Sequence, residues 1–120
     1  MLLVTKELEE RFLRYPLYSQ DGKGFDAQCI AHFYNPLGCG DWFITEAEKE
    51  ADDWLMFGYA DLGMGPENSE FGYISFKELA ELSLPLGLGI EYSLDTDVLR
   101  VMLEDRGLKY IDFKDVAADQ

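Results

Sequence analysis

Two apolar stretches decide the fold: Asp41-Trp42-Phe43-Ile44-Thr45 and Trp54-Leu55-Met56-Phe57-Gly58-Tyr59-Ala60-Asp61. Both are short and rich in aromatic residues, which is typical of β-strands. Upstream, Gln28–Tyr34 has the same character, and the turn-forming residues 35–40 separate it from the first stretch. The three segments together predict a hairpin that continues into a third strand.

Outside these strands, three helices are predicted from N-cap residues that precede apolar residues at helical spacing. In the second of them, Leu79 and Leu82 are expected to face the core. Gly107 is expected to end the third helix, because glycine readily adopts the left-handed conformation found there. The predicted ranges are residues 5–15 after Thr5, residues 76–83 after Ser75, and residues 96–106 after Asp95.

The 120 residues fit a single domain, which we expect to span the whole chain, 1–120. The apolar loop 84–89 is expected to lie across the sheet. Together these features predict an α+β fold: a mostly antiparallel sheet of four or five strands with two or three helices packed on one face. Further short strands are predicted at residues 71–76, 91–94 and 108–113.

Two conformations are open for residues 46–53. Helix propensity and the spacing Thr45-x-x-Glu48, which matches a capping box, favour a helix. The segment has no apolar stripe beyond two alanines, which favours an exposed connection. If the backbone is extended, Glu46, Glu48, Glu50 and Asp52 share one face at steps of ~6.7 Å, a row comparable in spacing to a nucleic-acid backbone.

The net charge of −14, from 24 acidic and 10 basic residues, is the most unusual property of the chain. It disfavours binding to nucleic acid and to anionic membranes, and it favours basic partners. We expect the partner to be a basic surface of a nucleic-acid-binding protein, with this chain a monomer or a homodimer. The predicted partner-binding residues are Asp41, Glu46, Glu48, Glu50, Asp52, Asp53, Asp61, Glu67 and Glu70.

No catalytic motif accompanies this charge, so the sequence predicts a protein that is not an enzyme and binds no cofactor or metal. His32 is the only histidine and is expected to be packed on a strand. Cys29 and Cys39 are expected to be reduced thiols, and Gly63-Met64-Gly65 is expected to form a tight turn. No apolar run reaches the ~20 residues of a membrane span, and the start of the chain does not look like a signal peptide. A cytoplasmic location is therefore expected.

Several segments carry a family resemblance: Leu3-Val4-Thr5-Lys6-Glu7, Trp42-Phe43-Ile44-Thr45-Glu46, Phe57-Gly58-Tyr59-Ala60-Asp61-Leu62-Gly63-Met64-Gly65, Phe71-Gly72-Tyr73-Ile74-Ser75 and Pro85-Leu86-Gly87-Leu88. The chain resembles an uncharacterised bacterial family, a domain of unknown function, of small proteins found on plasmids, integrative elements and phage-like islands. The resemblance covers about residues 3–94, so residues 95–116 are expected to be an additional C-terminal helix and strand. It implies no activity and no catalytic residues. Its most specific parts are Asp61-Leu62-Gly63-Met64-Gly65 and Gly72-Tyr73-Ile74-Ser75, together with their separation.

Three functional hypotheses follow. The first is a binding protein of a mobile genetic element that uses its acidic surface, as a nucleic-acid mimic that inhibits a host defence nuclease or CRISPR effector. The second is a regulatory or assembly module that binds through an apolar interface, with the acids serving only solubility. The third is an enzyme with a carboxylate-bound metal.

Overall fold

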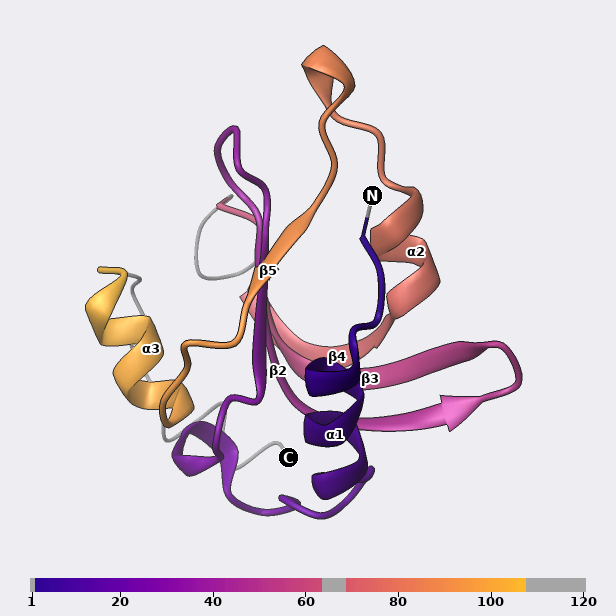
Figure 1. The fold of residues 1–120 in the computed structure, drawn as a ribbon. Helices are drawn as coiled ribbons and strands as arrows, with labels where there is room; N and C mark the ends of the chain where they lie inside the picture. The colour runs from indigo at the N-terminus through magenta and orange to yellow at the C-terminus, as the bar shows by residue number, and fades with distance from the viewer. Residues whose placement is uncertain (1, 64–68, 108–120) are drawn as a thin grey trace.

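A computed structural model describes residues 2–63 and 69–107, which form a five-stranded antiparallel sheet with helices on both faces (Figure 1). The order of strands across the sheet is β4-β3-β2-β1-β5. This confirms the predicted α+β class and the antiparallel sheet. The elements are α1 (Lys6–Arg14), η1 (Gly24–Asp26), β1 (Ala31–Tyr34), β2 (Asp41–Glu50), β3 (Asp53–Asp61), β4 (Ser69–Ser75), α2 (Phe76–Glu81), η3 (Pro85–Gly87), β5 (Glu91–Ser93) and α3 (Leu99–Asp105).

Residues 46–53, for which two conformations were open, form the end of β2, a tight turn and the start of β3. Glu48 pairs with Leu55 and Glu50 with Asp53. The pairing with β3 buries Ala47 in the core, whereas a helix that is not packed against the sheet would leave it exposed. Burial against a neighbouring strand thus outweighs the local helix propensity.

A bulge interrupts β2 where its register against β3 shifts between Ile44 and Glu46. At this point Gly58 of β3 lies very close to the backbone of β2. A Cβ atom on Gly58 would stand only 2.1 Å from the carbonyl oxygen of Phe43. Glycine is therefore required at this position by the approach of one strand to the other.

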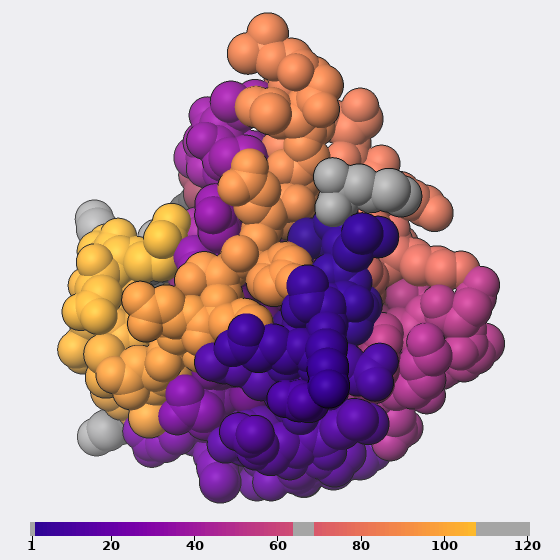
Figure 2. All heavy atoms as spheres, in the orientation of Figure 1, coloured from indigo at the N-terminus to yellow at the C-terminus, as the bar shows by residue number. Residues whose placement is uncertain are grey.

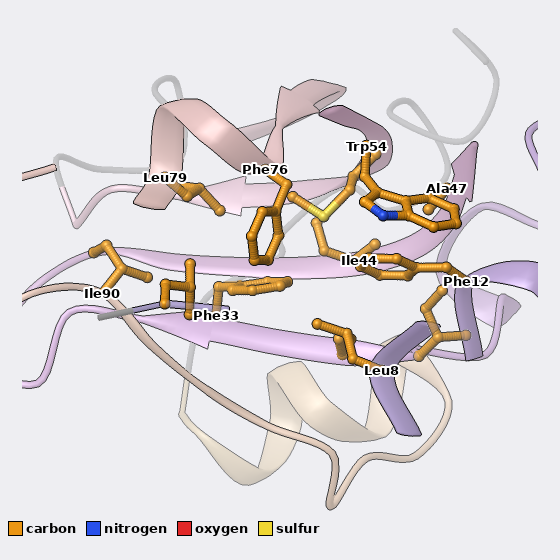
Figure 3. Packing of buried hydrophobic residues seen from close by; sticks show 13 residues of the cluster. Leu8, Phe12, Phe33, Ile44, Ala47, Trp54, Phe76, Leu79 and Ile90 are labelled. Carbon is orange, nitrogen blue, oxygen red and sulfur yellow. The ribbon is translucent and has the colours of Figure 1, made fainter. Parts of the chain in front are cut away.

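The main core lies between the sheet and the helices α1 and α2. Figure 3 shows the rings of Phe12 and Trp54 side by side, with their centroids 5.0 Å apart. Phe33 of β1 meets Phe76 of α2 edge to face at 5.9 Å. Two helices share this face, as the sequence predicts.

A second, smaller core fills part of the opposite face, where α3 and η1 pack. Its fully buried residues include Phe25 of η1 together with Leu99 and Leu103 of α3. The rings of Phe25 and Tyr59 meet at 5.3 Å. The third helix therefore lies on the other side of the sheet from α1 and α2, and the sheet is the middle layer.

Two of the three predicted N-caps are confirmed. Thr5 accepts a hydrogen bond from the Leu8 amide at 3.2 Å, and Ser75 accepts one from the Glu78 amide at 3.2 Å. The third prediction is wrong, because α3 begins at Leu99 rather than at residue 96. Residues 97–99 instead pair with residues 27–29 through backbone hydrogen bonds, so they are not free to join a helix.

The predictions for the connection between α2 and β5 are also wrong. Leu82 is 45% exposed rather than buried, because α2 ends one residue earlier. The loop 84–89 projects away from the body, as Figures 1 and 2 show, instead of lying across the sheet. Leu86 at its tip is 89% exposed. The predicted strand at residues 108–113 lies outside the described residues.

Candidate interaction surface

Three of the nine predicted partner-binding acids are buried. Asp41, Glu46 and Asp61 expose only 7%, 5% and 9% of their surface. They are held by internal hydrogen bonds, so they do not belong to an exposed acidic face. The sequence could not reveal this, because a strand pattern shows which residues share a face but not what covers that face.

Glu46 anchors the loop 17–27 to β2. One carboxylate oxygen accepts a hydrogen bond from the Tyr18 amide at 2.8 Å, and the other accepts one from the Gln20 amide at 2.9 Å. The Gln20 side chain adds hydrogen bonds to the Thr45 carbonyl and to the backbone of Gln28. These contacts seat the first half of the loop on the sheet.

Asp41 and Asp61 are also structural. Asp41 lies 2.7 Å from His32 Nε2 and 3.0 Å from Arg106 Nη2, so it joins β2 to β1 and to the end of α3. The His32 ring stacks on Phe43 at 4.5 Å, as expected of a packed histidine. Asp61 accepts a hydrogen bond from the Gly63 amide at 2.8 Å and shapes the turn after β3.

Asp53 supports the start of α2. It accepts hydrogen bonds from the Ser75 hydroxyl at 2.6 Å, from the Lys77 amide at 2.9 Å and from the Trp54 amide at 2.7 Å. Burial opposes ionisation of Asp53, but these donors outweigh it and hold the pKa of the carboxyl below its ordinary value. In the adjacent turn, an ion pair with Lys77 lowers the pKa of the exposed Asp52.

The acids that remain on the surface are Glu48, Glu50, Asp52 and Glu70, while Glu67 lies outside the described residues. Glu48 and Glu50 point to the same face of the hairpin, two residues apart on β2. The predicted row of four is therefore reduced to these two strand residues and Asp52 in the turn.

Beside these acids, aromatic side chains form a partly exposed strip on the sheet, with Phe57 half-buried and Tyr73 exposed. Phe57 of β3 pairs with Tyr73 of β4, and their rings meet at 5.3 Å. Tyr73 is 56% exposed, and Tyr18 from the neighbouring loop is 69% exposed. We call the surface formed by Tyr18, Glu48, Glu50, Phe57 and Tyr73 the open face. The helices α3 and η1 pack on the same side of the sheet but over its other part, at Phe43 and Tyr59.

A small cavity of about 70 Å³ lies at the edge of the open face. Its walls include Tyr18, Phe57, Phe71 and Tyr73, and Glu46 also lines it. A hydrogen bond with Tyr18 favours the protonated Tyr73 hydroxyl and raises its pKa, and the nearby Glu46 and Asp21 charges act in the same direction. The cavity thus combines aromatic walls with negative charge.

No group of three or more metal-ligating side chains gathers among residues 2–63 and 69–107. None of the helices in this part of the chain is long and apolar enough to cross a membrane.

The two cysteines differ sharply in environment, which leads to a testable difference in reactivity. Burial raises the pKa of Cys29 to about 12, whereas Cys39 lies exposed in the turn after β1. Because the thiolate is the reactive form, a disulfide reagent at neutral pH is expected to label one thiol per native chain. It should label two in denaturant. Rapid labelling of both thiols in the native protein would contradict the burial of Cys29.

Comparison with known proteins identifies the family of the chain. A family model described as "Protein of unknown function (DUF2958)" matches residues 3–102. No curated protein and no solved structure is significantly similar to the chain. The match runs past residue 94, where the resemblance was expected to end, and includes the first turn of α3. The fold described above is therefore that of a member of the DUF2958 family of proteins of unknown function.

Proposed function

We propose that this protein is a binding protein, not an enzyme, that engages a basic partner through its open face. The observation that carries the proposal is the exposed Tyr73 ring packed on the half-buried Phe57 ring, on the sheet beside Glu48 and Glu50. Aromatic residues contribute most of the binding energy in many protein interfaces. Carboxylates around them select partners of positive charge and accelerate association.

The charge of the whole chain supports the same choice of partner. A net charge of −14 repels nucleic acids and other acidic proteins and attracts basic ones over distances of about 10 Å at moderate salt. A protein with a groove that binds nucleic acid has a basic surface of this kind, and we propose it as the partner. In the narrower form of the proposal, Glu48, Glu50 and Asp52 occupy that groove as a mimic of phosphates and inhibit a host defence nuclease or CRISPR effector.

The resemblance to proteins of plasmids and phage-like islands supports placing this function on a mobile genetic element. Inhibition of a host defence enzyme would benefit such an element directly.

The narrower form makes a distinct prediction, because a mimic and nucleic acid compete for one groove. Added DNA or RNA is therefore expected to release the partner.

The acids of the hairpin are expected to be necessary for this binding. In the variant Glu48→Gln/Glu50→Gln/Asp52→Asn, partners recovered from a bacterial lysate at low salt should fall at least tenfold. In the wild type, the same partners should be released as the salt concentration rises, since exposed charges are screened. Quantitative mass spectrometry of the captured proteins measures both effects.

A matched control removes three charges elsewhere. Glu7, Glu9 and Glu10 are exposed on α1, and the variant Glu7→Gln/Glu9→Gln/Glu10→Gln has the same net charge as the hairpin variant. It is expected to keep the partners. Equal loss in both variants would mean that only overall charge matters, and retention in both would contradict binding through the acidic hairpin.

A second candidate function rests on the projecting loop 82–88. Leu82, Leu86 and Leu88 are 45%, 89% and 38% exposed, which is unusual for three leucines so close together. An apolar surface of this kind favours the second hypothesis, an assembly module that forms a homodimer through the loop.

Sedimentation velocity distinguishes this candidate from the first. If the loop mediates self-association, the wild type should dimerise as its concentration rises, and Leu86→Ser should remain a monomer. Leu86 contributes little to the core, so the substitution is expected to change the free energy of unfolding by less than about 0.5 kcal/mol. A wild type that stays monomeric at high concentration would exclude the homodimer.

A further inference from the structure

We propose that the cavity beside Glu46 is a pocket for the ammonium end of a lysine side chain supplied by the partner. This inference rests on the proposed function and specifies the chemistry of the anchor at its centre. It follows from three properties of the cavity: a buried carboxylate without a cationic partner, aromatic walls, and a small volume.

The Glu46 carboxylate is buried without a basic side chain to neutralise it. Its hydrogen bonds come from the amides of Tyr18 and Gln20, which are neutral donors. No lysine or arginine among the described residues forms an ion pair with it. A buried acidic group that lacks a counter-charge favours the binding of a cation next to it.

The walls of the cavity suit a cation as well. Phe57 and Phe71 stack with their centroids 6.0 Å apart, and Tyr73 meets Phe57 edge to face at 5.3 Å. The faces of aromatic rings attract ammonium groups, and several rings around one site form the usual pocket for alkylammonium ligands. An anion would be repelled by Glu46 and by the negative faces of the rings.

The number of hydrogen-bond donors favours lysine over arginine. The cavity of about 70 Å³ has room for several water-sized groups, since one water molecule needs ~10–15 Å³ by the same measure. An ammonium group and its adjacent methylene fit this space. A guanidinium is larger, planar and has five donors to satisfy, so it is expected to bind less well.

Binding of small amines tests the pocket without the partner. Nα-acetyl-lysine N-methylamide is titrated into the ¹⁵N-labelled protein, and the amide signals of Tyr18 and Gln20 are followed. Saturable shifts of these two signals are expected, since both amides donate to Glu46. The norleucine analogue, which has no charge, should leave them unchanged, and the arginine analogue should bind several-fold more weakly.

Two variants connect the binding to the pocket. Tyr73→Leu retains an apolar side chain at an exposed position, and it is expected to weaken lysine binding about two- to fivefold through loss of a cation–π contact. Glu46→Gln is expected to abolish binding. The exposed Glu70→Gln on the same strand as Tyr73 has the same charge change as Glu46→Gln and should retain full affinity.

Absence of saturable shifts with the lysine analogue, or equal shifts with the norleucine analogue, would overturn the lysine pocket. That result would not decide whether the acidic hairpin binds a partner. The hairpin variant tests this separately, because it keeps Glu46 and Tyr73. Conversely, lysine binding with no loss of partners in the hairpin variant would support the pocket and contradict the wider acidic interface.

Discussion

Gly58→Ala is expected to lower the free energy of unfolding by at least about 3 kcal/mol. The new methyl group would stand 2.1 Å from the Phe43 carbonyl oxygen and 2.8 Å from the Ile44 Cα atom. Both contacts are to backbone, so no change of side-chain rotamer can relieve them. Either β2 moves away from β3 at the bulge or the hairpin loses its register, and denaturant-induced unfolding measures the loss.

Gly72→Ala is the matched control for this prediction. Gly72 lies directly opposite Gly58 in the pairing of β3 with β4, yet a Cβ atom there would meet nothing within 4 Å. Alanine at this position is expected to leave stability unchanged or raise it by a few tenths of a kcal/mol, since it restricts the unfolded chain. If both substitutions destabilise the protein equally, the close approach at Gly58 is not the cause.

Glu46→Ala is expected to destabilise the protein by about 2–4 kcal/mol, because the Tyr18 and Gln20 amides both lose their acceptor. The effect should be concentrated in the loop 17–27. Hydrogen exchange at these two amides is therefore expected to accelerate far more than exchange in α1 or β1. Chemical denaturation and hydrogen exchange by NMR provide the two measurements.

Glu48→Ala changes the same residue type two positions along the same strand face. Because Glu48 is exposed, its removal is expected to alter the free energy of unfolding by no more than about 0.5 kcal/mol. The pair separates a buried carboxylate that holds the fold from an exposed one that does not. Similar losses in stability for both variants would contradict the buried role assigned to Glu46.

Much of the fold could be predicted from the sequence because local patterns determine it. Aromatic and β-branched runs predict β2 and β3, and the side chains of Thr5 and Ser75 mark the starts of two helices. Turn-forming residues mark the connection between β1 and β2. At these elements the pattern lies within the segment itself, which is why it could be predicted.

The sequence was misleading, or left two conformations open, where another segment competes for the same residues. The helix was predicted to start at residue 96, but residues 97–99 pair with residues 27–29 in a short bridge instead. Residues 46–53 have helix propensity, but pairing with β3 makes them a hairpin. The partner of residues 97–99 is remote in the sequence, so no local pattern reveals it. The partner of residues 46–50 follows at once in β3, but helix propensity alone does not show that the two segments pair.

The sequence by itself determined that this chain is acidic, that it has an antiparallel sheet, and that Glu46, Glu48 and Glu50 share one face if extended. Only the tertiary structure decided that the first of them is covered by the loop 17–27 while the other two are exposed. The physical reason is that alternation along a strand follows from backbone geometry alone. Burial of one residue on that face depends on a loop almost 30 residues away, whose amides Glu46 satisfies.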